Sequence, residues 1–161
     1  GNQGMTCSLP VLEYAKELHV SEDKTYRALA LSNLIAIHQK TGIGRLSAYC
    51  GAVSAGAAAG AGIAYLCGGG YEEVIHTVVN ALAIVSGMVC DGAKASCAAK
   101  IAASVDAGIL GYNMYLQGQQ FYAGDGIITK GIEGTIDNVG RLGKDGMKET
   151  NEEIIRIMIN D

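Results

Sequence analysis

The chain of 161 residues contains no tryptophan, one proline and one phenylalanine, and only 17% of its residues are charged. Because 49% of the residues are hydrophobic, this composition excludes an intrinsically disordered chain. Lysine and arginine together number 12 against 16 aspartates and glutamates, the net charge is −4, and no basic stripe is visible. We therefore expect no nucleic-acid partner. The length is that of one domain and is sufficient for a buried core.

The first residues lack the features of a signal peptide, since the chain begins with the polar stretch GNQG. We therefore expect a cytoplasmic protein, in which disulfides are rare. The cysteines are five in number, so at least one cannot pair within the chain; they are Cys7, Cys50, Cys67, Cys90 and Cys97. Because the first residue is not methionine, we also expect residues 1–161 to be a piece of a longer chain.

Two segments without charge, residues 46–67 and 74–90, are about long enough to raise the question of membrane-spanning helices. The first has small residues at every fourth position, as in helices that pack closely in bilayers. However, it consists mainly of alanine and glycine, and the second segment contains His76 and Asn80. Neither segment has a Trp/Tyr belt with flanking lysine or arginine. We therefore favour two buried helices of a helical domain and expect no contact with a membrane.

Apolar residues recur at helical spacing along most of the chain, and no alternating strand pattern of useful length occurs. We expect helices that begin at Ser8 with Pro10 in the first turn, at Ser21, over about 47–66, 72–89 and 96–115, after Thr129, and at a capping box on Thr150. In the first of these, Leu12, Ala15 and Leu18 form the expected apolar stripe. The expected buried face of the helix over 72–89 consists of Val74, Val78, Ala81, Leu82 and Val85.

The segment 47–66 is rich in glycine, and each glycine costs a helix interior roughly 1 kcal/mol. Only close packing against neighbours can hold such a helix, and the missing side chains permit that packing. The sequence therefore predicts an all-α fold: a single compact helical domain with a buried Gly/Ala-rich central helix.

Three of the cysteines, Cys50, Cys90 and Cys97, lie at the ends of apolar helices beside turn residues. The absence of a CxxC pattern excludes zinc ribbons and ferredoxin-type sites. Seven residues in a straight helix would separate the Cα atoms of Cys90 and Cys97 by about 10.5 Å. Convergence of their sulfur atoms on one metal centre therefore requires a turn at Asp91-Gly92. Buried, inert thiols are the alternative, and we keep it for Cys7 and Cys67.

A second group of candidates lies at the helix-to-loop junction of residues 38–45. His38 could remove a proton near neutral pH, and Arg45 could bind a carboxylate through two hydrogen bonds. The alternative is that His38 and Lys40 only mark a helix C-terminus, where cations are favoured. Further charged candidates are Asp91, Lys94 and Lys100.

The segments 38–51 (HQKTGIGRLSAYCG) and 90–97 (CDGAKASC) resemble the iron–sulfur serine dehydratase alpha-chain family, and most closely its L-cysteine desulfidase branch. The opening GNQG and the GRLG of residues 140–143 are similar to the same branch. The resemblance covers essentially the whole chain. Gly92 stands where the serine dehydratase branch has a proline, and the gap to the next cysteine is shorter, which favours the desulfidase branch.

This resemblance implies a lyase with an oxygen-sensitive [4Fe–4S] cluster held by Cys50, Cys90 and Cys97. The fourth iron would stay open and act as a Lewis acid on a small L-amino acid. A protein base would remove the α-proton, the β-group would leave, and the enamine would hydrolyse to pyruvate and ammonia. L-Cysteine would also release hydrogen sulfide, whereas L-serine would not. We assign proton transfer to His38 and carboxylate binding to Arg45.

Members of the family are longer on the N-terminal side, so the resemblance implies that residues 1–161 are the C-terminal part of a longer chain. It also implies that the N-terminal region of this parent chain is a partner. The fragment by itself could then be inactive and free of its cluster. A non-catalytic helical module for redox sensing or assembly is the alternative function. The glycine-rich face and the isoleucine-rich last helix leave room for a homodimer.

Overall fold

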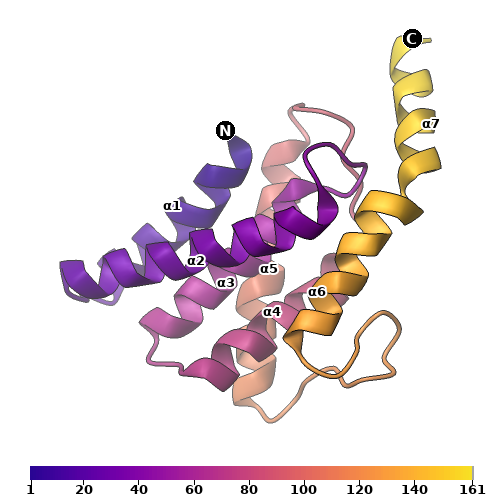
Figure 1. Cartoon of the computed structure of the whole chain (residues 1–161). Helices are drawn as coiled ribbons and strands as arrows, with labels where there is room; N and C mark the ends of the chain where they lie inside the picture. The colour runs from indigo at the N-terminus through magenta and orange to yellow at the C-terminus, as the bar shows by residue number, and fades with distance from the viewer. Residues whose placement is uncertain (161) are drawn as a thin grey trace.

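The computed structural model describes residues 1–160, which form seven α-helices and no β-sheet (Figure 1). The helices are α1 (Asn2–Glu17), α2 (Glu22–Ile43), α3 (Gly51–Leu66), α4 (Tyr71–Val85), α5 (Cys97–Leu116), α6 (Ile132–Arg141) and α7 (Lys148–Ile159). A π-helical segment, Leu142–Gly146, joins α6 to α7. The predicted all-α domain is confirmed.

Helix α3 lies at the centre, where it packs against α1, α2, α4 and α5. All its residues from Ala52 to Ala64 are buried, which confirms the predicted Gly/Ala-rich central helix. The backbones of α3 and α5 touch, because a Cβ atom on Gly60 would lie only 2.6 Å from the Cα atom of Gly108. The glycines therefore contribute close approach of two helices, which compensates for their poor helix propensity.

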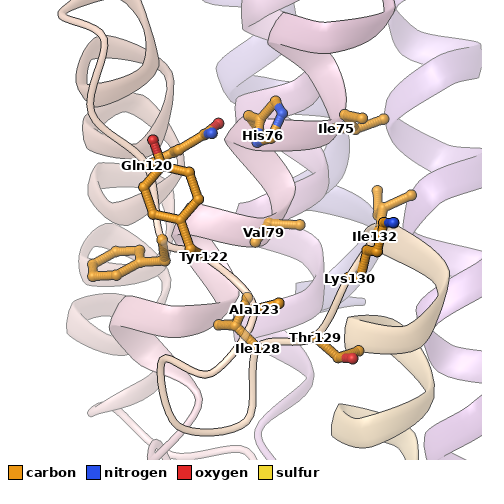
Figure 2. Close-up of a pocket in the computed structure, with 12 residues that line it drawn as sticks. Ile75, His76, Val79, Gln120, Tyr122, Ala123, Ile128, Thr129, Lys130 and Ile132 are labelled. Atoms are coloured by element: carbon orange, nitrogen blue, oxygen red, sulfur yellow. The ribbon is translucent and has the colours of Figure 1, made fainter.

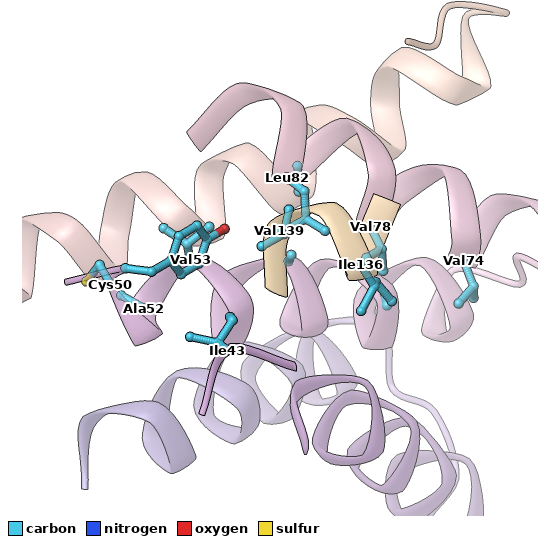
Figure 3. Packing of buried hydrophobic residues seen from close by; sticks show 13 residues of the cluster. Ile43, Cys50, Ala52, Val53, Val74, Val78, Leu82, Ile136 and Val139 are labelled. Carbon is cyan, nitrogen blue, oxygen red and sulfur yellow. The ribbon is translucent and has the colours of Figure 1, made fainter. Parts of the chain in front are cut away.

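The main core joins α2, α3, α4 and α6 (Figure 3). Ile43 of α2, Val53 of α3, Leu82 of α4 and Val139 of α6 are all almost fully buried there. The predicted buried face of α4 is present, with Val74, Val78, Ala81 and Leu82 inside and Val85 partly buried against the cluster. Burial of these side chains supplies most of the free energy that holds the helices together.

The first helix differs from its prediction, since α1 begins at Asn2 and contains Pro10 in its interior. Proline in a helix interior removes one backbone donor and crowds the carbonyl group four residues earlier, at a cost of about 3 kcal/mol. The preceding turns are held by tertiary contacts, because Thr6 and Cys7 are buried and the Ser32 hydroxyl donates to the Cys7 carbonyl at 2.9 Å. The buried stripe accordingly runs through Cys7, Val11 and Ala15, and Leu18 is exposed.

The predicted starts of the last two helices were also wrong. Helix α6 begins at Ile132 after Gly131, whose φ of 83° marks the turn into the helix, so Thr129 is not its N-cap. Helix α7 begins at Lys148 as a continuation of the π-helical segment, which places Thr150 inside it and leaves no capping box there. No residue of α7 is buried, and the helix projects from the body (Figure 1).

The start of α3 and the end of α4 differ from their predicted positions, and this difference matters for the site. Helix α4 ends at Val85 rather than at residue 89, and α3 begins at Gly51 rather than at residue 47. The residues just before α3 and just after α4 instead pair with each other, through an antiparallel bridge between Tyr49 and Val89. No helix formed by residues 1–160 combines the length and the apolar character needed to cross a bilayer.

Candidate metal centre

A short antiparallel pairing brings the segments of Cys50 and Cys90 side by side. The Cys50 amide donates to the Met88 carbonyl at 3.1 Å, and the Cys90 amide donates to the Ala48 carbonyl at 2.6 Å. Residues 38 and 42 positions apart in the chain are thereby joined by backbone hydrogen bonds. This pairing puts both cysteines on one wall of the molecule.

The third cysteine, Cys97, is the first residue of α5. Between it and Cys90 the chain turns at Gly92, which has a φ of 87° that favours glycine, so the predicted turn is present. The Cys97 Sγ atom accepts the Lys94 amide at 3.4 Å and lies 3.5 Å from the Gly92 carbonyl oxygen. The turn therefore folds the seven-residue segment back instead of extending it along a helix.

The three cysteines line a single cavity of about 150 Å³. The other lining residues are Asn2, Gln3, Gly51, Ala52, Gly92, Ala93, Lys100 and Ile101. Cys50 is 5% exposed, whereas Cys90 and Cys97 are half-buried, and none of the three forms a disulfide. The structure thus gathers three free thiols from distant parts of the chain around one small space.

Helix N-termini surround this cavity. Cys50 is the N-cap residue of α3, Cys97 opens α5, and Asn2 opens α1. The positive end of a helix dipole stabilises a thiolate. The pKa of the Cys50 thiol nevertheless lies above its ordinary value, and burial is the largest cause. Cys90 and Cys97 raise this pKa further, whereas the Ala52 amide and Lys100 lower it. Metal binding at this thiol would therefore release a proton.

One cation faces the thiols, the ammonium group of Lys100. Its Nζ atom donates to Asp91 Oδ1 at 2.5 Å and to the Val89 carbonyl oxygen at 3.0 Å. The hydrogen bond from Lys100 lowers the pKa of Asp91, and the same bond raises the pKa of Lys100. At neutral pH the pair is therefore fully charged, with the ammonium group beside the cavity.

The cavity lining offers three thiols as metal donors and contains no carboxylate or imidazole group. Within residues 1–160, no three His, Cys, Asp or Glu side chains are grouped closely enough to hold a single metal ion. Iron–sulfur clusters are held by cysteine thiolates on different iron atoms. Three thiols around a common cavity, without additional carboxylate or imidazole donors in its lining, match that chemistry.

The other two predicted site residues lie elsewhere. His38 Nε2 is 2.7 Å from Glu133 Oε2 in an exposed pair between α2 and α6. Arg45 follows Gly44, the C-cap of α2, and borders a surface pocket with Ile37 and Lys40. Neither His38 nor Arg45 is part of the lining of the cysteine cavity.

A family model described as "Serine dehydratase alpha chain" matches residues 1–156. The chain belongs to this family. Its relatives are UPF0597 proteins: one from Desulfitobacterium hafniense is 71% identical over 99% of the chain, one from Lachnoclostridium phytofermentans is 61% identical over 99%, and one from Treponema denticola is 53% identical over 100%.

These relatives are much longer proteins. The chain spans 37% of the Desulfitobacterium and Treponema proteins and 38% of the Lachnoclostridium protein. No solved structure matches the chain significantly. Membership of the serine dehydratase alpha-chain family is therefore shown by sequence similarity.

The opening GNQG was noted only as part of the resemblance, and the structure places two of its residues, Asn2 and Gln3, in the lining of the cavity. Both lie in the first turn of α1, and a Cβ atom on Gly51 would collide with the Gln3 side chain. The absence of a side chain at Gly51 therefore leaves space for Gln3 at the N-terminal end of α3. Lys100 was among the charged candidates of the sequence. Its place beside Cys97 follows from helix geometry, because residues three apart on a helix share a face.

A second cavity, of about 220 Å³, lies between α4 and the loop that leads to α6 (Figure 2). Its lining is largely apolar and includes Ile75, Val79 and Ile128. His76 borders it and stacks on Tyr115 with 4.6 Å between the ring centroids. His76 of α4 therefore packs against a side chain of α5.

Proposed function

We propose that this chain is the cluster-binding part of a [4Fe–4S]-dependent lyase that acts on a small L-amino acid. The proposed reaction converts L-cysteine to pyruvate, ammonia and hydrogen sulfide, or L-serine to pyruvate and ammonia. The observation that carries the proposal is the meeting of Cys50, Cys90 and Cys97 at one cavity in a member of the serine dehydratase alpha-chain family.

In this proposal the three thiolates hold the cluster, which supplies a Lewis acid for the leaving β-substituent when bound. The residues of the chain provide the surroundings. The N-termini of α3 and α5 favour negative charge at the cavity, and Ile101 together with Ala52 and Ala93 gives it an apolar wall. A low-dielectric wall strengthens the interaction between charged groups in the site.

His38 and Arg45 remain the proposed residues for proton transfer and for carboxylate binding. Both are separate from the cysteine cavity within this chain. The proposal for them therefore rests on the resemblance of the segment 38–51 alone. The remaining length of the relatives leaves room for additional site residues, and we propose that the N-terminal region of the parent protein contributes them.

The decisive experiment is anaerobic reconstitution of the full-length natural protein with iron and sulfide. We expect a broad absorption band at roughly 400 nm, as for thiolate-bound clusters. Substitution of Cys50, Cys90 or Cys97 by serine should abolish the band. Cys67→Ser is the matched control, because Cys67 is exposed at the end of α3 and should leave the band unchanged.

The same preparation distinguishes an enzyme from the alternative module. Pyruvate formation from L-cysteine and from L-serine should depend on the cluster and on each of the three cysteines. A loaded protein that forms no pyruvate from either amino acid would instead indicate a redox-sensing or assembly role. An unchanged absorption spectrum in all three serine variants would remove the ligand assignment.

A further inference from the structure

Lys100 connects the start of α5 to the segment that carries Cys90. Its ammonium group donates to the Val89 carbonyl and to the Asp91 carboxylate, which flank Cys90 on either side. Its side chain is 20% exposed, so most of the stem is covered by protein. Because Cys97 lies one turn earlier on α5, this single side chain ties together the two segments that supply two of the three thiols.

The hydrogen bonds of Lys100 leave one donor free. A lysine ammonium group has three N–H donors. Val89 and Asp91 accept two of them, and among residues 1–160 no acceptor is found for the third. Since Lys100 also lines the cavity, an N–H donor is available at its edge.

The charge of Lys100 also indicates a role at this cavity. Within the described part of the chain, Lys100 is the one positively charged residue in the lining of the cavity. Three thiolates would bring negative charge into a space with apolar walls, where charges interact more strongly than in water. Asp91 is 46% exposed, so its carboxylate is better screened by solvent than the ammonium group.

We propose that Lys100 is a positioning residue of the cluster site. It fixes the turn of Cys90 through Val89 and Asp91, and its charge reduces the net negative charge of the cluster with its three thiolates. This inference rests on the proposed function, because it concerns the group that Cys50, Cys90 and Cys97 would hold. The reduction potential of an iron–sulfur cluster depends on net charge and on hydrogen bonds to sulfur.

The test compares Lys100→Met, Lys100→Arg and Lys16→Met in the full-length protein after anaerobic reconstitution. Lys16 forms an exposed pair with Glu13 near the C-terminal end of α1, so its loss removes the same charge far from the cavity. The readouts are iron per chain and the reduction potential of the cluster. We expect a lower iron content and a more negative potential in Lys100→Met, wild-type values in Lys16→Met, and recovery of the potential in Lys100→Arg.

A second variant keeps the inference testable if Lys100→Met does not fold. Asp91→Asn retains the ammonium group and removes the neighbouring negative charge, so the potential should shift in the opposite direction, to more positive values. Hydrogen exchange of the metal-free protein should also be faster over residues 86–96 in Lys100→Met than in Lys16→Met, because the turn has lost its anchor.

The negative results of this experiment can be distinguished from one another. A wild-type protein that takes up no iron contradicts the proposed function and this inference with it. A loaded wild type whose potential and iron content are the same in Lys100→Met overturns the role of Lys100 alone. Equal losses in Lys100→Met and Lys100→Arg would mean that packing of the lysine stem, and not its charge, matters at this position.

Discussion

Cys7 and Cys67 illustrate how the surroundings of a single thiol decide its chemistry. Cys7 is 3% exposed on the inner face of α1, and burial raises its pKa to about 11. Cys67 follows the last residue of α3 and is exposed, so the expectation of a buried thiol is confirmed for Cys7 and wrong for Cys67. A thiol must be deprotonated and accessible in order to react, so burial protects Cys7 in both respects.

We predict that Cys67 reacts with iodoacetamide at pH 8 and that Cys7 in the folded protein does not. With a pKa of about 11, Cys7 is almost entirely protonated at this pH, and its labelling should be at least about tenfold slower. Mass spectrometry of the metal-free protein would locate the label. In denaturant the two cysteines should react alike, and equal rates in the folded protein would contradict the burial of Cys7.

At the scale of secondary structure, contact between helices outweighs intrinsic helix propensity. Helix α3 carries several glycines in its interior and is nevertheless the most deeply buried helix of the described chain. Gly60 faces Gly108 of α5 at a distance that leaves no space for a side chain. The same residues that weaken an isolated helix are therefore required for this packing.

We predict that Gly60→Ala lowers the free energy of unfolding by about 1–3 kcal/mol, because the added methyl group pushes α5 away. Gly4→Ala is the matched control, since no atom lies within 4 Å of the new Cβ position in α1. Alanine favours the helix by up to about 1 kcal/mol, so this variant should be slightly more stable. Urea unfolding would measure both changes, and an unaffected Gly60→Ala would contradict the close crossing of α3 and α5.

Two leucines that differ in burial allow the contribution of the core to stability to be measured. Leu82 of α4 is fully buried in the main cluster (Figure 3). Leu34 of α2 is 65% exposed. Leu82→Ala should cost about 2–5 kcal/mol through lost burial and a residual cavity. Leu34→Ala should change stability by less than about 0.5 kcal/mol. Similar losses in the two variants would mean that another surface covers α2 in solution.

At the scale of the whole molecule, His38 and Glu133 join helices that are distant in sequence. The pair links α2 to α6 on the surface, and such exposed pairs contribute at most about 1 kcal/mol. The fold should therefore tolerate substitution at either position. This permits a test of the catalytic assignment of His38 that is independent of stability.

We predict that His38→Asn lowers kcat of the reconstituted full-length protein by about 100-fold or more, the usual contribution of a general base. Glu133→Gln removes the carboxylate partner without removing the imidazole, and it should retain most of the activity. Steady-state pyruvate assays of both variants would decide the matter. Equal activity in the two would assign His38 a structural role only.

The amount of structure that could be predicted depended on how local its cause was. Helical periodicity identified the face of α4 through Val78 and Leu82, because that face depends on a repeat within one segment. The ends of the helices were less predictable. At α1, burial of Thr6 and Cys7 extended the helix, and at α7 the π-helical segment replaced the expected cap at Thr150.

The sequence by itself determined the all-α fold, the need for a closely packed central helix and membership of the serine dehydratase alpha-chain family, since each follows from local pattern or from recognisable motifs. Only the tertiary structure decided that Cys50, Cys90 and Cys97 share a cavity with Lys100. The reason is physical: their approach depends on backbone pairing between residues 48–50 and 88–90 and on the turn at Gly92, and no periodicity within a single helix contains that information.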